Sequence, residues 1–146
     1  MKPPDGEIIR EVKQWLAYGE EDLRLAKHAF GLSDETPYRL IAYHAQQCAE
    51  KYLKAYLVFY VIDFPYTHDL QRLLMLCPAK ASWAERLPDV AELNPYATTA
   101  RYPGEELEVS EREARRAVEI AERVRQAVRS ALQDEGFESG GENKIL

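Results

Sequence analysis

The chain has 146 residues, of which 46% are hydrophobic and 30% charged, and its formal net charge is −6. This length favours a single domain that buries a sizeable core. The acidic balance excludes a general electrostatic attraction to nucleic acid, although a local basic patch can still act because the potential depends on how the charges are distributed.

The N-terminal residues lack an apolar signal region, and the longest apolar run, residues 55–62, is too short to cross a bilayer. Cys48 and Cys77 lie in apolar segments without a C-x-x-C pair. We therefore expect buried free thiols in a reducing compartment, and a cytoplasmic protein with no membrane contact.

Two long helices are predicted in the first half of the chain. Apolar residues recur at helical spacing over residues 7–30, and Gly31 and Pro37 then interrupt the pattern. The second helix is predicted over residues 38–61, a segment without glycine or proline.

Shorter elements follow. Thr67 or Asp69 is placed to cap a helix that stops at Pro78, and short helical segments are predicted over residues 82–87 and 88–96. Residues 98–110 lack a helical period and indicate a loop. Ser110 then opens the last helix, because its spacing to Glu113 matches a capping box.

An apolar stripe marks the core-facing side of that last helix, which is predicted to reach residue 132. We find no sustained two-residue alternation and no internal repeat. The sequence therefore predicts an all-α, up-and-down antiparallel bundle of about five helices, with a single domain over residues 7–132 and a flexible Gly-rich tail over residues 133–146.

The second helix carries a polar stripe among residues typical of a core. His44, Gln47, Lys51 and Lys54 share one side because they are three or four positions apart. One interpretation is a solvated face, in which Glu50 forms an exposed pair with Lys54. The other is that the stripe contacts a phosphate or another subunit.

Two further segments carry candidate binding residues. His68 lies at the first turn of a short helix, where it either fastens the loop or contacts a ligand. Arg101 and Tyr102 lie in the predicted loop. Arginine suits bidentate binding of phosphate or carboxylate, and tyrosine suits stacking.

The sequence lacks the common signatures of metal and nucleophilic sites. The three histidines, His28, His44 and His68, have no zinc-type spacing, and there is no G-x-S-x-G or Gly-rich phosphate loop. We expect no metal and no cofactor. Catalytic candidates are His44, His68 and Arg101, with no complete motif behind them.

Three segments in this order resemble the HEPN (higher eukaryotes and prokaryotes nucleotide-binding) domain family. They are YHAQQCAEKYLKAYL at residues 43–57, YTHDLQRLL at 66–74 and ARYP at 100–103. The resemblance covers about residues 7–132. It implies a helical bundle that pairs as a homodimer, binds nucleotides and acts with a minimal nucleotidyltransferase, in some cases as a toxin–antitoxin pair.

Another branch of the family consists of metal-independent ribonucleases with an Arg-x(4–6)-His motif near the start of the last helix. Here Arg101 has no histidine after it. Arg39 and His44 fit the spacing, but they lie on the second helix. The resemblance therefore argues against an intact ribonuclease motif.

Three functions remain open. The first is a nucleotide- or phosphate-binding module with a nucleotidyltransferase partner, the second a ribonuclease toxin and the third a non-catalytic dimeric assembly protein. For the first, the predicted ligand-binding residues are Lys51, Lys54, His68, Arg101 and Tyr102. The nine Tyr and two Trp favour a homodimer because aromatic residues are enriched at interface cores.

Overall fold

The computed structural model describes residues 5–78, 81–98, 102–105 and 107–137. Its elements are α1 (Gly6–Ala29), α2 (Tyr38–Phe59), α3 (Leu70–Met75), the 3-10 helices η1 (Ser82–Arg86) and η2 (Pro88–Tyr96), and α4 (Glu111–Asp134). No strand occurs in these residues, which confirms the predicted all-α class. None of the helices in this part of the chain has the length and apolar character to span a membrane.

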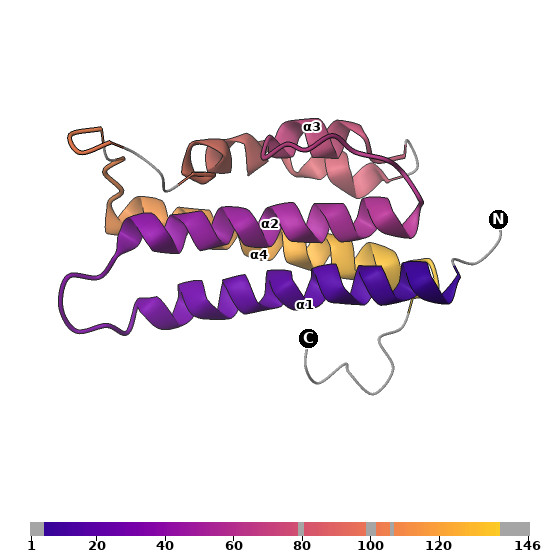
Figure 1. Ribbon diagram of the computed structural model, residues 1–146, viewed down its shortest axis with the longest axis horizontal. Helices are drawn as coiled ribbons and strands as arrows, with labels where there is room; N and C mark the ends of the chain where they lie inside the picture. The colour runs from indigo at the N-terminus through magenta and orange to yellow at the C-terminus, as the bar shows by residue number, and fades with distance from the viewer. Residues whose placement is uncertain (1–4, 79–80, 99–101, 106, 138–146) are drawn as a thin grey trace.

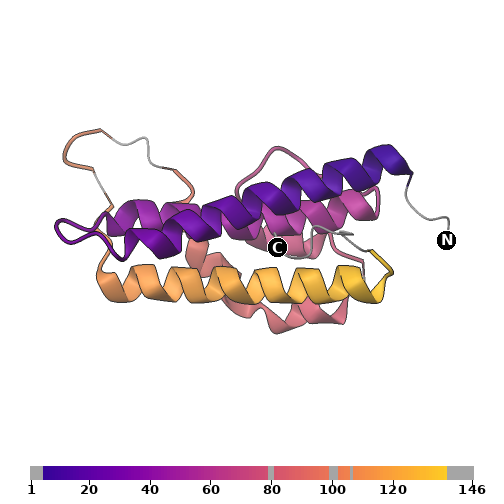
Figure 2. The ribbon, with the colours of Figure 1, turned by 90° about the horizontal axis from the view of Figure 1, so that it is seen from below.

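The helices form an up-and-down bundle around α2. In Figure 1, α1 runs antiparallel to α2, the short helices α3, η1 and η2 return along the other side of α2, and α4 runs parallel to α2. Figure 2 shows α1, α2 and α4 extended along a common axis. Helix α2 packs against α1, α4, η2 and α3, so it is the centre of the bundle.

Caps define the helix starts. The Ser110 side chain accepts a hydrogen bond from the Glu113 amide at 3.0 Å, and the Glu113 carboxylate accepts one from the Ser110 amide at 2.9 Å, which confirms the predicted capping box. At α3 the cap is Asp69, whose carboxylate accepts from the amides of Gln71 and Arg72. Thr67 instead accepts from the Asp69 amide.

Two predicted helix ends were wrong by two residues each. Helix α2 stops at Phe59 rather than at residue 61, because Val61 adopts a left-handed conformation with φ of 55°. Helix α4 continues to Asp134 rather than ending at residue 132, so the first residues of the predicted tail are helical. Residues 138–146 of that tail lie outside the described part of the chain.

The path of the chain after α4 depends on Gly136. Its φ of 88° turns the chain at the end of the helix, and the Phe137 amide then donates to the Leu132 carbonyl at 2.9 Å. Phe137 is buried and its ring lies edge-on to Phe59, with centroids 6.1 Å apart. A glycine that suggested a flexible tail in fact closes the helix onto the core.

Helices α1 and α2 approach closely at Gly19. A side-chain carbon at this position would lie 3.0 Å from two ring atoms of Tyr52. The Tyr52 ring has little freedom to move, because it is fully buried and its hydroxyl donates to Glu20 at 2.7 Å. The absence of a side chain at Gly19 therefore allows this helix pair to pack.

We expect Gly19→Val to lower the free energy of unfolding by about 1–3 kcal/mol, because the valine overpacks against Tyr52. Glu21→Val is the matched control, since it puts the same residue on the exposed side of α1, where a change of roughly 0.5 kcal/mol is typical. Urea unfolding measures both. Equal effects of the two substitutions would contradict the close-approach argument.

Candidate functional site

A buried polar cluster joins α2 to the loop before α3. One Glu50 oxygen accepts from the Lys54 ammonium at 2.8 Å, and the other lies 2.8 Å from His68 Nδ1 and accepts from the Gln46 amide at 3.0 Å. The Gln46 side chain also donates to the His68 carbonyl at 3.2 Å. We call Gln46, Glu50, Lys54 and His68 the Glu50 network.

The surroundings of the Glu50 network keep both charges in place. Lys54 and Glu50 are only 6% and 4% exposed. The Lys54 ammonium lies 5.5 Å from the ring centres of both Trp15 and Phe64, close enough for cation–π attraction. Burial opposes the charged form of Glu50, but hydrogen bonds from Lys54, Gln46 and His68 outweigh it and lower the pKa of this carboxyl group.

A second cluster lies between α1 and α2. Asp22 is buried on α1, and its two oxygens lie 2.8 Å from His44 Nδ1 and 2.5 Å from the Lys51 ammonium. We call these three residues the Asp22 network. The side chains of His44 and Lys51 are about a quarter exposed, at 26% and 22%.

A third cluster joins three helices. Glu20 on α1 accepts from the Tyr52 hydroxyl on α2 and from Arg125 Nε on α4, both at 2.7 Å. Burial, together with the hydrogen bond to Glu20, raises the pKa of Tyr52. This cluster was not predicted, because its members lie 32 and 105 positions from Glu20 in the chain.

The predicted polar stripe is therefore not a solvated face. Lys54 is buried, so the exposed Glu50–Lys54 pair that one interpretation required is wrong. The structure brings Lys54 and His68 together through Glu50, whereas Lys51 and His44 meet at Asp22. The two candidate histidines consequently belong to separate networks, and Nδ1 of each faces a carboxylate.

The third predicted segment lies elsewhere. Arg101 is outside the described residues, so its contacts are not part of the structure. Tyr102 is 79% exposed. Its segment, residues 102–105, precedes α4 and projects beyond the end of the bundle where α2 and α4 begin (Figures 1 and 2).

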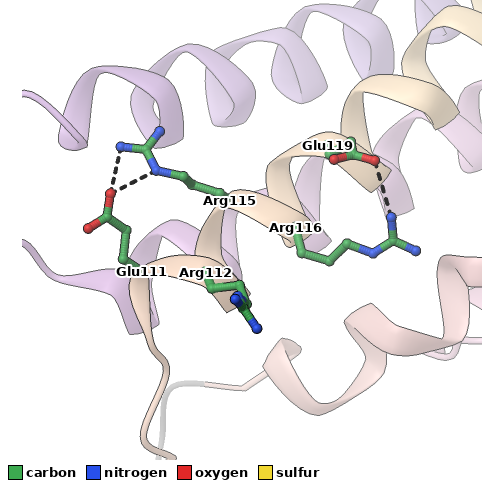
Figure 3. Close-up of a pocket in the computed structure, with 5 residues that line it drawn as sticks. All are labelled: Glu111, Arg112, Arg115, Arg116 and Glu119. Carbon is green, nitrogen blue, oxygen red and sulfur yellow. Dashed lines mark hydrogen bonds and ion pairs between the residues drawn. The ribbon is translucent and has the colours of Figure 1, made fainter.

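An arginine-lined cleft on α4 was missed by the sequence analysis. Arg112, Arg115 and Arg116 project from the first turns of this helix, as Figure 3 shows, together with Glu111 and Glu119. Arg115 pairs with Glu111 at 2.8 Å, and its guanidinium lies 4.3 Å from the centre of the Phe30 ring. The segment EREARR after a capping box was the available signal, because it places three arginines within two turns.

Arg116 reaches from α4 to the short helix η2. It pairs with Asp89 at 3.0 Å, with Glu92 at 3.2 Å and with Glu119 at 3.1 Å. The space between η2 and α4 is a second cleft, and Arg112 and Arg116 line both clefts. We call it the η2–α4 cleft, and it is lined by Glu92, Leu93, Tyr96, Arg112, Glu113 and Arg116, with further contacts from α4.

Arg112 differs from its two neighbours. Within the described residues, its guanidinium has no ion pair and no hydrogen bond, and Figure 3 draws no interaction to it. It lines both clefts. Arg112 is thus a cation of the cleft that is free to meet an anion.

Other chemistry finds less support in this part of the chain. No group of three or more His, Cys, Asp and Glu side chains among the described residues is arranged to hold a metal ion. Cys48 is buried, and burial, followed by the nearby charges of Asp22 and Glu20, raises the pKa of its thiol. A raised pKa disfavours the thiolate that a nucleophile needs.

We expect Glu50→Ala to lower the free energy of unfolding by about 3–5 kcal/mol, because the Lys54 ammonium stays buried without its carboxylate. Glu111→Ala is the control, since the contacts it removes, an ion pair with Arg115 and a hydrogen bond from Tyr38, are exposed and should matter much less. Urea unfolding at pH 7 compares the two. A loss no larger than that of the control would contradict the role of the network.

The same carboxyl group makes stability depend on acid. Because the pKa of Glu50 is lower in the folded chain, its contribution is complete above the unfolded value near 4.5 and is lost as pH falls through the folded value. Glu50→Gln should therefore flatten the loss of stability below about pH 4.5. An unchanged acid profile in this variant would argue against a charged Glu50.

Comparison with known proteins places the chain in a family. Residues 12–131 match the model of the HEPN domain. The fold is similar to TT1696 from Thermus thermophilus, with 24% identity, a TM-score of 0.67 and coverage of 82% of this chain and 96% of that one. It is also similar to ST0689, described as an archaeal HEPN homologue, with 29% identity, a TM-score of 0.60 and coverage of 83% and 97%. No curated protein matches the sequence. The chain belongs to the HEPN domain family.

Proposed function

We propose that this HEPN protein is a nucleotide- or phosphate-binding module that acts with a minimal nucleotidyltransferase partner, as in a toxin–antitoxin pair. Membership of the HEPN family supports the proposed nucleotidyltransferase partner. The arginine-lined cleft at the start of α4 is the observation that supports the proposed nucleotide or phosphate ligand. Arginines are suited to phosphate because their guanidinium groups donate two parallel hydrogen bonds.

The contacts of three predicted residues lead us to propose a different cation for the ligand. Lys54 is enclosed by Glu50, Trp15 and Phe64, so its charge serves the fold. Lys51 and His68 are partly exposed but already face Asp22 and Glu50. The arginine-lined cleft on α4 instead contains Arg112, which has no ion pair and no hydrogen bond within the described residues.

Two predicted residues keep their proposed role. Arg101 and Tyr102 precede α4 by about ten residues in the sequence. Tyr102 is exposed, so its ring is accessible to a base. We retain both as proposed ligand contacts.

We expect the purified protein to bind nucleotides in a calorimetric titration with nucleoside mono-, di- and triphosphates. The titration is run with the chain alone and with a minimal nucleotidyltransferase encoded beside it. Binding that strengthens in the complex supports the two-component module. If no nucleotide binds in either case, the ligand part of the proposal fails.

We also propose that the protein is a homodimer, paired through the exposed side of α1 and α2. Tyr18 and Leu25 are 45% and 54% exposed and lie on one side of α1, two turns apart, while Leu40 is exposed on α2. Between them lies the Asp22 network, whose acid is compensated by Lys51. The exposed apolar side chains suit a second copy, and one acid, the exposed Glu21, lies between Tyr18 and Leu25 on this side of α1.

We expect a solution mass of twice 16.8 kDa by light scattering, and Leu25→Glu should shift it to 16.8 kDa because it buries a charge in the interface. Met75→Glu is the matched control, since Met75 is 76% exposed on α3, away from this face. Circular dichroism verifies that both variants fold. A wild-type monomer at tens of micromolar, or equal dissociation by both variants, would refute the proposed interface.

A further inference from the structure

We infer that the η2–α4 cleft holds a nucleoside monophosphate, with the phosphate on Arg112 and the base beside Tyr96. This rests on the proposed nucleotide-binding function and adds to it the place in the fold and the number of phosphates. The cleft has a volume of about 330 Å³, within the range of small-molecule sites. It lies between two helices that are adjacent in space and separated in the sequence.

The charges around the cleft select a single phosphate. Arg115 and Arg116 are in ion pairs with carboxylates of α4 and η2, as is Arg123 with Asp89 at 3.2 Å. Arg112 is the arginine of the cleft that has no such partner within the described residues. One uncommitted cation matches one phosphate group, because the ion-paired arginines would have to give up a carboxylate to bind more.

Carboxylates inside the cleft strengthen that selection. Glu92 and Glu113 both line it, so a polyphosphate chain would meet negative charge beyond Arg112. The same carboxylates have further acceptor positions, since each oxygen has two lone pairs. Glu92 uses its oxygens for Arg116, and Glu113 uses one for the Ser110 amide. Ribose hydroxyls and exocyclic amines are donors that suit the remaining positions.

The opposite wall suits an aromatic base. Tyr96 is half-buried in the cleft, and Leu93 and Ile120 form its apolar floor. The Tyr96 hydroxyl is neutral at pH 7 in any case, and burial, followed by the nearby charges of Glu113 and Glu92, raises its pKa further. A neutral tyrosine beside an apolar floor offers a stacking surface to any base.

The test is a calorimetric titration of the full chain with AMP, ATP and inorganic phosphate, using wild type and three variants. We expect AMP to bind more tightly than ATP. Arg112→Ala should weaken AMP by roughly 10- to 100-fold, because it removes a hydrogen bond between charged groups. Arg72→Ala, an exposed arginine on α3, is the control and should leave the affinity unchanged.

Tyr96→Leu tests the contact with the base separately from the contact with the phosphate. It should weaken AMP by about 10-fold through lost stacking, while inorganic phosphate binds as before. Tight binding of AMP that is the same in wild type and Arg112→Ala overturns this inference and leaves the proposed function standing. ATP binding more tightly than AMP overturns the selection of one phosphate, and no binding of any nucleotide overturns the proposed function as well.

Discussion

The burial of two opposite charges on the central helix constrains the rest of the bundle. Glu50 and Lys54 lie one turn apart on α2 and are both withdrawn from water. Their mutual attraction does not compensate for two lost hydration shells unless further groups complete their coordination. His68 supplies a nitrogen to Glu50, and Phe64 and Trp15 enclose Lys54. The loop before α3 must therefore run back along α2, so that Phe64 and His68 reach the pair. Helix α1 must lie so that Trp15 faces Lys54.

The same principle fixes α1 against its neighbours. Two of its acids, Glu20 and Asp22, point to different partners: Glu20 toward Tyr52 and Arg125, Asp22 toward His44 and Lys51. Because each is partly or fully buried, losing its cation, Arg125 for Glu20 or Lys51 for Asp22, would leave the carboxylate charge poorly compensated. Polar residues at the centre of the fold thus serve its geometry, whereas Arg112, which has no ion pair within the described residues, lies on the outer helix α4.

Sequence reasoning succeeded where local rules decide the structure. The capping box at Ser110, the helical period of the long helices and the all-α bundle follow from spacing alone. The burial of Lys54 did not follow, because Phe64 and His68 approach it only through the path of a loop. A helical wheel places Lys54 correctly beside Lys51 but says nothing of what covers either one. The η2–α4 cleft was missed for the same reason, since η2 and α4 meet only in the folded chain. Gly136 and Gly19 likewise take their roles from Phe59 and Tyr52, contact partners that are distant in the sequence.

The close fit at Gly19 also has a mechanical consequence. A rotation of α1 about its own axis would turn a residue with a side chain into the Tyr52 ring, so the close fit at Gly19 opposes this rotation. The ion pair between Glu20 on α1 and Arg125 on α4 also ties α1 to α4. The remaining side of the bundle, made of α3, η1 and η2, consists of short helices of 6, 5 and 9 residues. Closure of the η2–α4 cleft around a ligand would then move α3, η1 and η2 relative to the long helices α1, α2 and α4.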